Sequence, residues 1–468
     1  MLVFLAAILI LVNVLIASWY NLKSPFWLDE IIVGSTACKS NYFDVLEAVR
    51  GDPSPPTHWV ISHALFNVFG CELVSVRIVN AVLVAVGLFL LLRILYSKYG
   101  FDTALLFVTM FTGSFTVTYY SFEARMYALL MFSCLTMLGA VLLARWHIAV
   151  LFACFAASLH LFGWYLYVVL VAIYFLLYGA PTRGQRLTLG VGILVNVLFY
   201  GYTILPLASS VSGASSWFLK PGLLDLFYIP SFIFGGAAQY ILYSLSALLI
   251  WINYKSHGFD HTELLILCCS LIIAFVLILF IVSQYKPMFA PRYAVFLAPV
   301  LFLGLSSWLG AWLSQSSSAR EVKSSAVIGL VIVSSCCSVF DTINIGPHLR
   351  PLGWDVISYN SICASINCGF VLDDPIIPFT PDTAYHQISN FPVQYRNSRV
   401  EWEAVRPEKL DNWLDENPDK PFIYVRSSRP VVDIHELMAK KKLLCTREDR
   451  QPASYLCLSK NSRDPRNM

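Results

Sequence analysis

The sequence predicts a polytopic α-helical membrane protein that ends in a small soluble α/β domain. Hydrophobic residues make up 57% of the 468-residue chain and charged residues only 13%, a balance that a soluble globule does not have. Apolar runs long enough to cross a hydrocarbon core about 30 Å thick recur along residues 1–340. The net charge of +3 is small for the length, and no basic run or zinc-like Cys/His spacing indicates nucleic-acid binding.

The apolar segments follow one another along the chain. Residues 1–20 form the first one, which lacks a basic leading region and a small-residue cleavage site, so we expect a retained anchor rather than a removed signal peptide. Further membrane spans are expected at 76–95, 103–120, 127–144, 187–206, 230–252, 262–282, 293–313 and 325–340.

The run 148–178 is too long for one span, because a single helix of that length would measure about 46 Å. Arg145 lies just before this run, and Arg183 and Arg186 lie just after it. Positive residues mark the cytoplasmic side of a membrane, so both ends should be inside and the run should turn back near residues 160–163. This gives about eleven spans, with the N-terminus inside and the C-terminus outside.

From residue 341 onward the composition becomes that of an ordinary soluble domain. Strands are predicted at 368–372, 422–425, 442–445 and 455–458, and helices at 407–416 and 432–441. We therefore expect a transmembrane domain over 1–340, with a first outer loop at 21–75, and an extracytoplasmic α/β domain over 341–468. No Gly-rich phosphate loop occurs in the second domain, which we assign a supporting or acceptor-recognition role.

Cysteine positions agree with this topology. Of the 12 cysteines, half lie inside the expected spans, where a small apolar residue needs no special role. The others fall on the expected outer side: Cys38, Cys71, Cys363, Cys368, Cys445 and Cys457. An even number in an oxidising compartment permits disulfides, with free thiols as the alternative. Connectivity cannot be deduced from sequence, so the pairs Cys38/Cys71, Cys363/Cys368 and Cys445/Cys457 stay open.

Acidic residues gather in the first outer loop. Asp29 and Glu30 are adjacent, Asp52 follows in the same loop, and the apolar stretches 43–49 and 59–69 between and after them are suited to helices that lie in the membrane interface. Partial burial at that depth would raise a carboxylate's pKa and help it to act as a base toward a hydroxyl group. The alternative is that Asp29 and Glu30 only cap a helix.

Basic residues on the same side complement these acids. Arg125, Lys286 and Arg292 fall in expected outer turns, and a phosphate leaving group needs such cations. Taken singly, each is also explained as an interfacial residue whose charged end reaches the membrane surface. His160 lies at an expected outer turn. One interpretation of this residue is proton transfer, and the alternative is a histidine that only makes a hydrogen bond at a helix end. No HExxH or paired-His spacing indicates a metal site.

Several of these residues belong to motifs with a familiar order. The block Asp52–Trp59, followed by Phe69-Gly70 and by Ser75–Arg77, resembles the conserved block of the protein O-mannosyltransferase superfamily. These are multispanning GT-C glycosyltransferases, and they include the bacterial aminoarabinose transferases that act on lipid A. Trp27–Glu30 resembles the first-loop acidic motif of that superfamily, and an α/β tail after the last span is usual for its bacterial members.

Two basic motifs extend the resemblance, which covers roughly residues 1–315. Arg125 with Tyr127 resembles the superfamily's Arg-x-Tyr motif, and Arg292-Tyr293 followed by Pro299 resembles its late Arg-Tyr and Pro pattern. The chain departs from relatives that hold the lipid phosphate with a Lys before the Pro-Pro pair, because Ser54 stands there. Other cations must then bind the phosphate.

The resemblance implies a GT-C-like enzyme that uses a polyprenyl-phosphate-linked sugar. The sugar would pass, by direct displacement with inversion, to a hydroxyl acceptor of the cell envelope (a lipid, glycan or protein) on the extracytoplasmic face. Asp29 is the implied base, with Glu30 as runner-up, and the role of Asp52 stays open. Arg125, Lys286 and Arg292 would stabilise the leaving phosphate. Further substrate-cavity candidates are His58, Tyr127, Tyr293 and His160. Neither a cofactor nor a metal is implied.

Two other functions remain as alternatives. A transporter or flippase of lipid-linked sugars would place its polar residues near the midplane of the spans, whereas here they concentrate in the outer loops. A ligase of lipid-linked glycans would share the donor class and would transfer whole glycans from a diphosphate carrier.

The topology makes a direct prediction. Because the expected number of spans is odd, the tail that begins at Asp341 should lie outside the cytoplasm. Reporter fusions at the C-terminus, or labelling of an introduced terminal cysteine in intact cells, would measure this. A cytoplasmic tail would contradict the turn within 148–178 or remove another span.

Overall fold

In the computed structural model, the described residues are 2–23, 28–49, 55–208, 221–253, 261–285, 289–315, 320–344, 369–373, 403–405, 409–418, 422–426, 434–447 and 454–459. The chain divides into two compact units. One comprises 1–23, 46–61 and 74–346, and the other comprises 24–45, 62–73 and 347–468. The division between domains at residue 341 stays a prediction.

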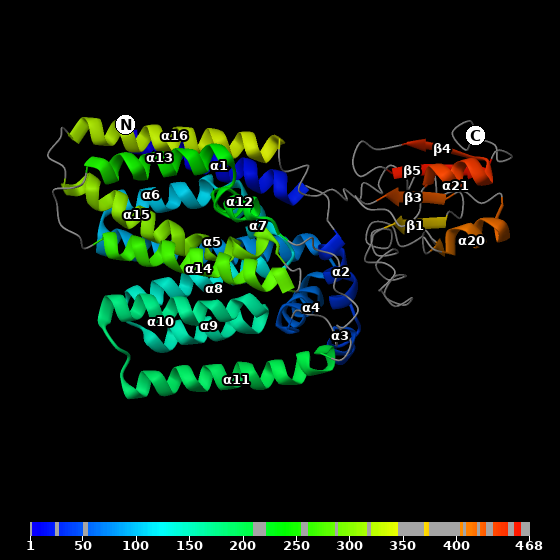
Figure 1. Ribbon diagram of the computed structural model, residues 1–468, viewed down its shortest axis with the longest axis horizontal. Helices are drawn as coiled ribbons and strands as arrows, with labels where there is room; N and C mark the ends of the chain where they lie inside the picture. The colour runs from blue at the N-terminus through cyan, green and yellow to red at the C-terminus, as the bar shows by residue number, and fades with distance from the viewer. Residues whose placement is uncertain are drawn as a thin grey trace. The chain divides into compact units, whose positions relative to one another are not determined.

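The first unit is a bundle of apolar helices (Figure 1). In chain order these are α1 (Leu2–Lys23), α5 (Leu73–Tyr99), α6 (Phe101–Gly113), α7 (Phe115–Phe122), α8 (Met126–Leu142), α9 (Trp146–Leu159), the 3₁₀ helix η1 (Leu161–Trp164), α10 (Tyr165–Tyr178), α11 (Arg183–Ala208), α12 (Leu223–Phe234), α13 (Ala237–Asn253), α14 (Thr262–Tyr285), the 3₁₀ helix η2 (Pro291–Leu297), α15 (Ala298–Gln315) and α16 (Arg320–Asn344).

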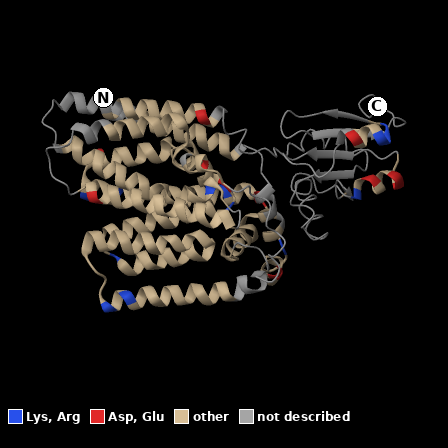
Figure 2. Ribbon diagram, viewed as in Figure 1, with Lys and Arg blue, Asp and Glu red and all other residues tan. Residues whose placement is uncertain are grey.

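The described helices confirm an integral membrane protein. Four segments are long and apolar enough to cross a membrane: α5, η1 with α10, α14, and η2 with α15. Two bent helix pairs pass the same criterion, and shorter apolar helices include parts of α1 and α16 together with α8 and α9. Charged residues are sparse along these helices (Figure 2). The expected total of eleven spans stays a prediction.

The long run 148–178 is broken where its flanking charges predicted. Helix α9 ends at Leu159, α10 begins at Tyr165, and the two helices pack against each other (Figure 1). Gly163 makes the turn feasible, since a Cβ at this position would lie 2.0 Å from the Ala156 carbonyl oxygen. Only glycine allows so close an approach of two backbone segments.

Two expected spans are bent rather than straight. The segment 103–120 consists of α6 and α7, which meet at an angle of 69°, and the segment 230–252 contains the break between α12 and α13, bent by 89°. Ser114 stops the first helix because it adopts an extended conformation and its Oγ accepts the Val117 N–H, at 3.2 Å. Gly235 stops the second with a left-handed φ of 91°. Hydropathy alone did not detect these breaks.

The described parts of the loop 21–75 are largely helical. Helices α2 (Leu28–Ala37), α3 (Tyr42–Ala48) and α4 (Thr57–Phe69) lie there, and the last two occupy the stretches expected to be helical, whose interfacial position stays a prediction. A disulfide joins Cys38 to Cys71. Close to it, His63 Nδ1 bonds the Ala37 carbonyl at 2.8 Å, and Asn67 Nδ2 donates to His63 Nε2 at 3.1 Å. The imidazole, donating at Nδ1 and accepting at Nε2, connects the end of α2 to α4.

The tail contains a five-stranded sheet with the order β2-β1-β3-β5-β4. Its strands are β1 (Gly369–Asp373), β2 (Glu403–Ala404), β3 (Phe422–Arg426), β4 (Leu443–Arg447) and β5 (Ser454–Ser459). Strand β1 pairs in parallel with β2 and β3, whereas β5 is antiparallel to β3 and β4. Four of these strands lie where the sequence predicted them, and β2 was not expected.

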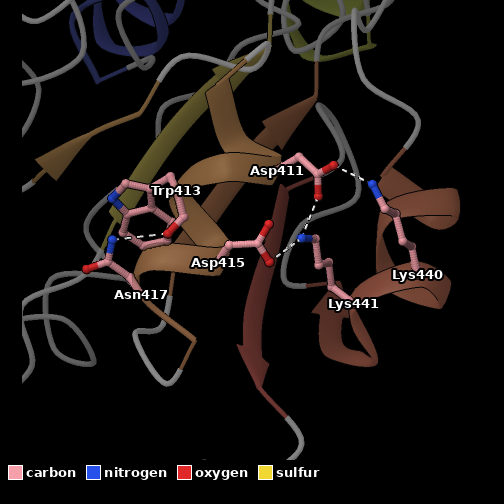
Figure 3. A network of polar contacts seen from close by, with 6 residues as sticks. All are labelled: Asp411, Trp413, Asp415, Asn417, Lys440 and Lys441. Atoms are coloured by element: carbon pink, nitrogen blue, oxygen red, sulfur yellow. Dashed lines mark hydrogen bonds and ion pairs between the residues drawn. The ribbon is translucent and has the colours of Figure 1, made fainter.

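Two helices pack with the sheet, and both were predicted: α20 (Leu410–Glu416) and α21 (Ile434–Lys441). They share a core that includes Leu410, Trp413 and Leu437. Lys441 bridges Asp411 at 2.8 Å and Asp415 at 2.6 Å, and Lys440 also pairs with Asp411 (Figure 3). These ion pairs are exposed, so the apolar core contributes more to holding the helices together.

The cysteines follow the sequence analysis. Within the described residues the free thiols are those in the helices of the first unit: Cys134, Cys154, Cys268, Cys269, Cys336 and Cys337. Cys457 on β5 is disulfide-bonded, and Cys445 lies directly opposite it on β4. Cys363 and Cys368 lie outside the described residues.

The bend at Gly235 leads to a stability prediction. In Gly235→Ala, the new Cβ would lie 2.4 Å from the Phe115 nitrogen, and the left-handed φ alone costs on the order of 1–3 kcal/mol. We expect a clearly lower unfolding temperature in detergent. The matched control is Gly329→Ala in α16, where a Cβ has open space and helix propensity favours alanine by roughly 0.5–1 kcal/mol. Equal stability of the two variants would contradict the described bend.

Candidate functional site

The short link between α7 and α8 carries Glu123 and Arg125 into the interior of the helical unit. Asn80 on α5 holds this link in place, because its Nδ2 donates to the Glu123 carbonyl at 2.6 Å and also reaches the Arg125 carbonyl at 3.4 Å. Arg125 has an extended backbone and precedes the first turn of α8. The side chain of Glu123 is fully buried, and that of Arg125 is half-buried.

Aromatic rings from four other elements gather beside this link. The His160 ring lies 5.4 Å from Tyr293 on η2 and 6.3 Å from Tyr127 on α8, measured between ring centroids. Phe162 on η1 contacts both His160 and Tyr293, at 5.1 and 4.9 Å. Tyr120 on α7 meets Tyr127 edge to face at 5.2 Å. The link between α7 and α8, the break at His160 and the 3₁₀ helix η2 thus bring aromatic and polar side chains together.

Two arginines converge on these rings. The Arg292 guanidinium lies 5.7 Å from the centroid of the Tyr293 ring, a cation–π distance. His160 and Tyr127 are each within electrostatic range of both Arg125 and Arg292. The two arginines belong to elements far apart in the sequence, and both are half-buried. Their charges therefore act on the same small volume.

His160 is uncharged and has one defined tautomer. Burial is the main cause that lowers its pKa to about 3, and the nearby Arg125 and Arg292 contribute in the same direction. The Phe162 backbone N–H donates to its Nδ1 at 3.1 Å. A neutral imidazole that accepts at Nδ1 carries its proton on Nε2. His160 is thus a neutral hydrogen-bond donor beside two cations.

His58 is a second uncharged histidine of this region. Its side chain, near the start of α4, is 2% exposed. Burial is the main cause that lowers its pKa to about 3, and Arg125 contributes. Neither histidine can therefore serve as a general base that gains a full charge near neutral pH. Both suit the roles of hydrogen bonding and positioning.

Glu123 and Asn80 are candidate residues that the sequence analysis did not single out. Glu123 lies within electrostatic range of Tyr120 and Tyr127. Its position in an outer turn, two residues before Arg125, was the available signal. Asn80 lies in an apolar span, where polar side chains are costly unless they are bonded. Arg77 of the motif block is buried in α5 and donates to the Asn21 carbonyl at 2.9 Å, which ties α5 to α1.

The structure brings together six of the predicted site residues: His58, Arg125, Tyr127, His160, Arg292 and Tyr293. Asp29 and Glu30 lie in the first turn of α2, which begins at Leu28, and Glu30 is buried. The side chain of Asp29 and the residues Asp52 and Lys286 lie outside the described residues. Among the described residues, no group of three or more His, Cys, Asp and Glu side chains could hold a metal ion.

Comparison with solved structures identifies the fold. The crystal structure of ArnT from Cupriavidus metallidurans in the apo state matches with a TM-score of 0.59 and 11% identity, over 96% of this chain and 97% of that one. ArnT bound to undecaprenyl phosphate matches with the same score and identity, over 99% of both chains. The arabinofuranosyltransferase AftD from Mycobacteria aligns with a TM-score of 0.46 and 13% identity, over 98% of this chain and 40% of that one.

No protein-family model and no curated protein sequence matches the chain. The chain nevertheless has the fold of ArnT over almost its whole length. At the level of the fold, the resemblance stated from the sequence motifs is therefore confirmed.

The two neutral histidines predict an acid-sensitive fold. Their pKa is about 3 in the folded protein and about 6.5 in the unfolded chain, so only the unfolded state gains their protons as the pH falls below 6.5. Each histidine should therefore lower the free energy of unfolding by about 1.4 kcal/mol for every pH unit below 6.5. We expect the drop in unfolding temperature between pH 7.5 and 5.0 to be smaller in His160→Asn, whose side-chain oxygen can still accept the Phe162 N–H.

The exposed His147 on α9 supplies the control, and His147→Asn should retain the full acid sensitivity. An unchanged pH dependence in His160→Asn would contradict the uncharged state of His160.

Proposed function

We propose that this protein is a membrane glycosyltransferase. It would transfer a sugar from a polyprenyl-phosphate-linked donor to a hydroxyl acceptor of the cell envelope, on the extracytoplasmic face and with inversion at the anomeric carbon. The observation that carries this proposal is the convergence of Arg125 and Arg292 at His160 and Tyr127, in a protein with the fold of ArnT. ArnT has been crystallised with undecaprenyl phosphate, which is a polyprenyl phosphate.

The proposed role of the arginines is to bind the donor phosphate. Each guanidinium offers a planar fork of N–H donors that matches phosphate oxygens, and its charge would stabilise the negative charge that grows as the sugar–phosphate bond breaks. His160 Nε2–H and the Tyr127 hydroxyl, a buried donor without a hydrogen-bond partner in the described structure, would complete the set. Lys286 is the further cation in this proposal.

The proposed base is Asp29. It would remove the proton of the acceptor hydroxyl as that oxygen attacks the anomeric carbon, and Glu30 is the runner-up or the residue that orients Asp29. Asp52 is the third carboxylate of the same loop. The support is the resemblance of Trp27–Glu30 to the superfamily's acidic motif and the occurrence of both acids in the first turn of α2.

Disulfides support an extracytoplasmic site. Cys38 and Cys71 are bonded in the loop that carries the acids, and Cys457 is bonded in the tail. Such bonds persist in oxidising compartments and are rare in the cytosol. The free thiols among the described residues all belong to the apolar helices. This distribution favours one outer side for both the first loop and the C-terminal sheet.

The alternatives find less support. A transporter or flippase places ionisable groups near the membrane midplane, whereas in Figure 2 most charged residues of the helical unit lie at or near helix ends. A ligase would share the lipid carrier, and it would differ by using a diphosphate carrier that bears a complete glycan.

Two substitutions test the proposal. In Asp29→Asn the size is kept and the carboxylate is lost, so sugar transfer should fall by at least about 10²-fold with folding preserved. In Arg125→Ala the phosphate loses charge-assisted hydrogen bonds, so a higher donor concentration should be needed. Transfer is measured by mass analysis of lipid-linked sugars and envelope glycans, in cells and with purified protein supplied with undecaprenyl-phosphate sugars. Arg93→Ala, an exposed arginine on the expected inner side, is the control.

Near-normal transfer by well-folded Asp29→Asn protein would exclude Asp29 and leave Glu30 and Asp52 as candidates. Full activity with a nucleotide sugar in the absence of lipid would exclude the polyprenyl-phosphate donor itself.

A further inference from the structure

The break between α6 and α7 meets the break between α12 and α13 inside the helical unit, on the side formed by α1, α13 and α16 (Figure 1). Ser114 in the α6–α7 break donates through its Oγ to the Ile233 carbonyl in α12 at 2.7 Å. A Cβ at Gly235 would lie 2.4 Å from the Phe115 nitrogen, so the backbones at the two breaks are in close contact. Each break leaves carbonyls that the helix cannot pair internally.

Side-chain donors satisfy these carbonyls. Asn13 on α1 donates through Nδ2 to the Thr112 carbonyl at 2.7 Å, and Gln239 on α13 donates through Nε2 to the next carbonyl, that of Gly113. The Tyr243 hydroxyl donates to Ser334 Oγ on α16 at 2.9 Å. The side-chain donors named here therefore already have hydrogen-bond acceptors.

Acceptors, in contrast, are left over. Among the buried side-chain oxygens without a hydrogen-bond partner in the described structure, four belong to the helices around the breaks: Asn13 Oδ1, Gln239 Oε1, Ser338 Oγ and Asp341 Oδ2. We call these four residues the Asp341 cluster. Asp341 is only 7% exposed, and the other three are buried more completely. A buried carboxylate oxygen without a partner is among the most costly groups in an apolar interior.

The cluster lies where the broken helices face α16. Ser334, Ser338 and Asp341 follow one another at helical spacing on α16, and all are buried. A Cβ at Gly236 would lie 2.7 Å from Asp341 Oδ2, and one at Gly113 would lie 2.1 Å from Ser334 Oγ and 3.6 Å from Gln239 Oε1. Glycine at both breaks thus gives room to the polar face of α16.

Buried acceptors around a carboxylate favour a ligand that brings positive charge. The cluster supplies one carboxylate and otherwise neutral oxygens, whereas calcium sites usually contain several carboxylates. The described residues offer no group of three His, Cys, Asp and Glu side chains that could hold a transition metal. The C-terminal ends of α6 and α12 also reach this region, and a helix C-terminus carries partial negative charge. We propose that the Asp341 cluster binds a monovalent cation of the sodium or potassium class.

The test is cation-dependent stability of the full-length protein in detergent at pH 8 and constant ionic strength. Sodium or potassium chloride should raise the unfolding temperature by about 2–4 °C over choline chloride, because a ligand that binds only the folded state stabilises it. The increase should disappear in Asp341→Asn and shrink in Ser338→Ala, which removes only one hydroxyl. It should persist in Glu263→Gln, where an exposed acid on α14 is neutralised.

Three results would overturn the proposal. Equal stability of the wild type in sodium, potassium and choline would mean that no such cation is bound. An equal loss of the effect in Glu263→Gln would indicate general charge screening. A cation-independent stability that changes with pH in the wild type and not in Asp341→Asn would mean that a proton fills the role. If Asp341→Asn does not fold, Ser338→Ala decides between these outcomes. The test does not depend on the proposed transferase activity.

Discussion

Satisfying backbone polar groups inside an apolar protein is the constraint on which the rest of this structure depends. An unbroken helix pairs its own backbone N–H and C=O groups. This chain, however, interrupts its apolar segments at Ser114, His160 and Gly235. Specific side chains bond the backbone at these interruptions. Asn13 and Gln239 bond the carbonyls before Ser114, His160 Nδ1 accepts the Phe162 N–H, and Ser114 Oγ donates to the Ile233 carbonyl before Gly235. Polar side chains enter the interior because the breaks require them.

The candidate site is a consequence of the same arrangement. Asn80 bonds two carbonyls of the link that carries Arg125 into the interior, and η2 brings Arg292 and Tyr293 to His160 from a distant part of the sequence. Two positive charges in a partly buried place disfavour a third positive charge there. His160 therefore stays neutral.

The loop and the tail follow a different principle. They have fewer apolar residues to bury, and covalent bonds supplement their packing: Cys38 with Cys71 in the loop, and Cys457 within the sheet. In the tail a small core that includes Trp413 stabilises α20 and α21, and the exposed pairs of Lys440 and Lys441 with Asp411 add little. Disulfides are the usual means by which small units in an oxidising compartment gain stability.

The sequence by itself determined the membrane class, the order of the apolar segments, the break near His160 and most elements of the tail. These features depend on local hydropathy, charge and periodicity, which are properties of neighbouring residues. The bends at Ser114 and Gly235, the importance of Glu123 and Asn80, and the convergence of Arg125 with Arg292 were decided only by the tertiary structure. Each depends on contacts between segments far apart in the chain, for which one sequence contains no local signal.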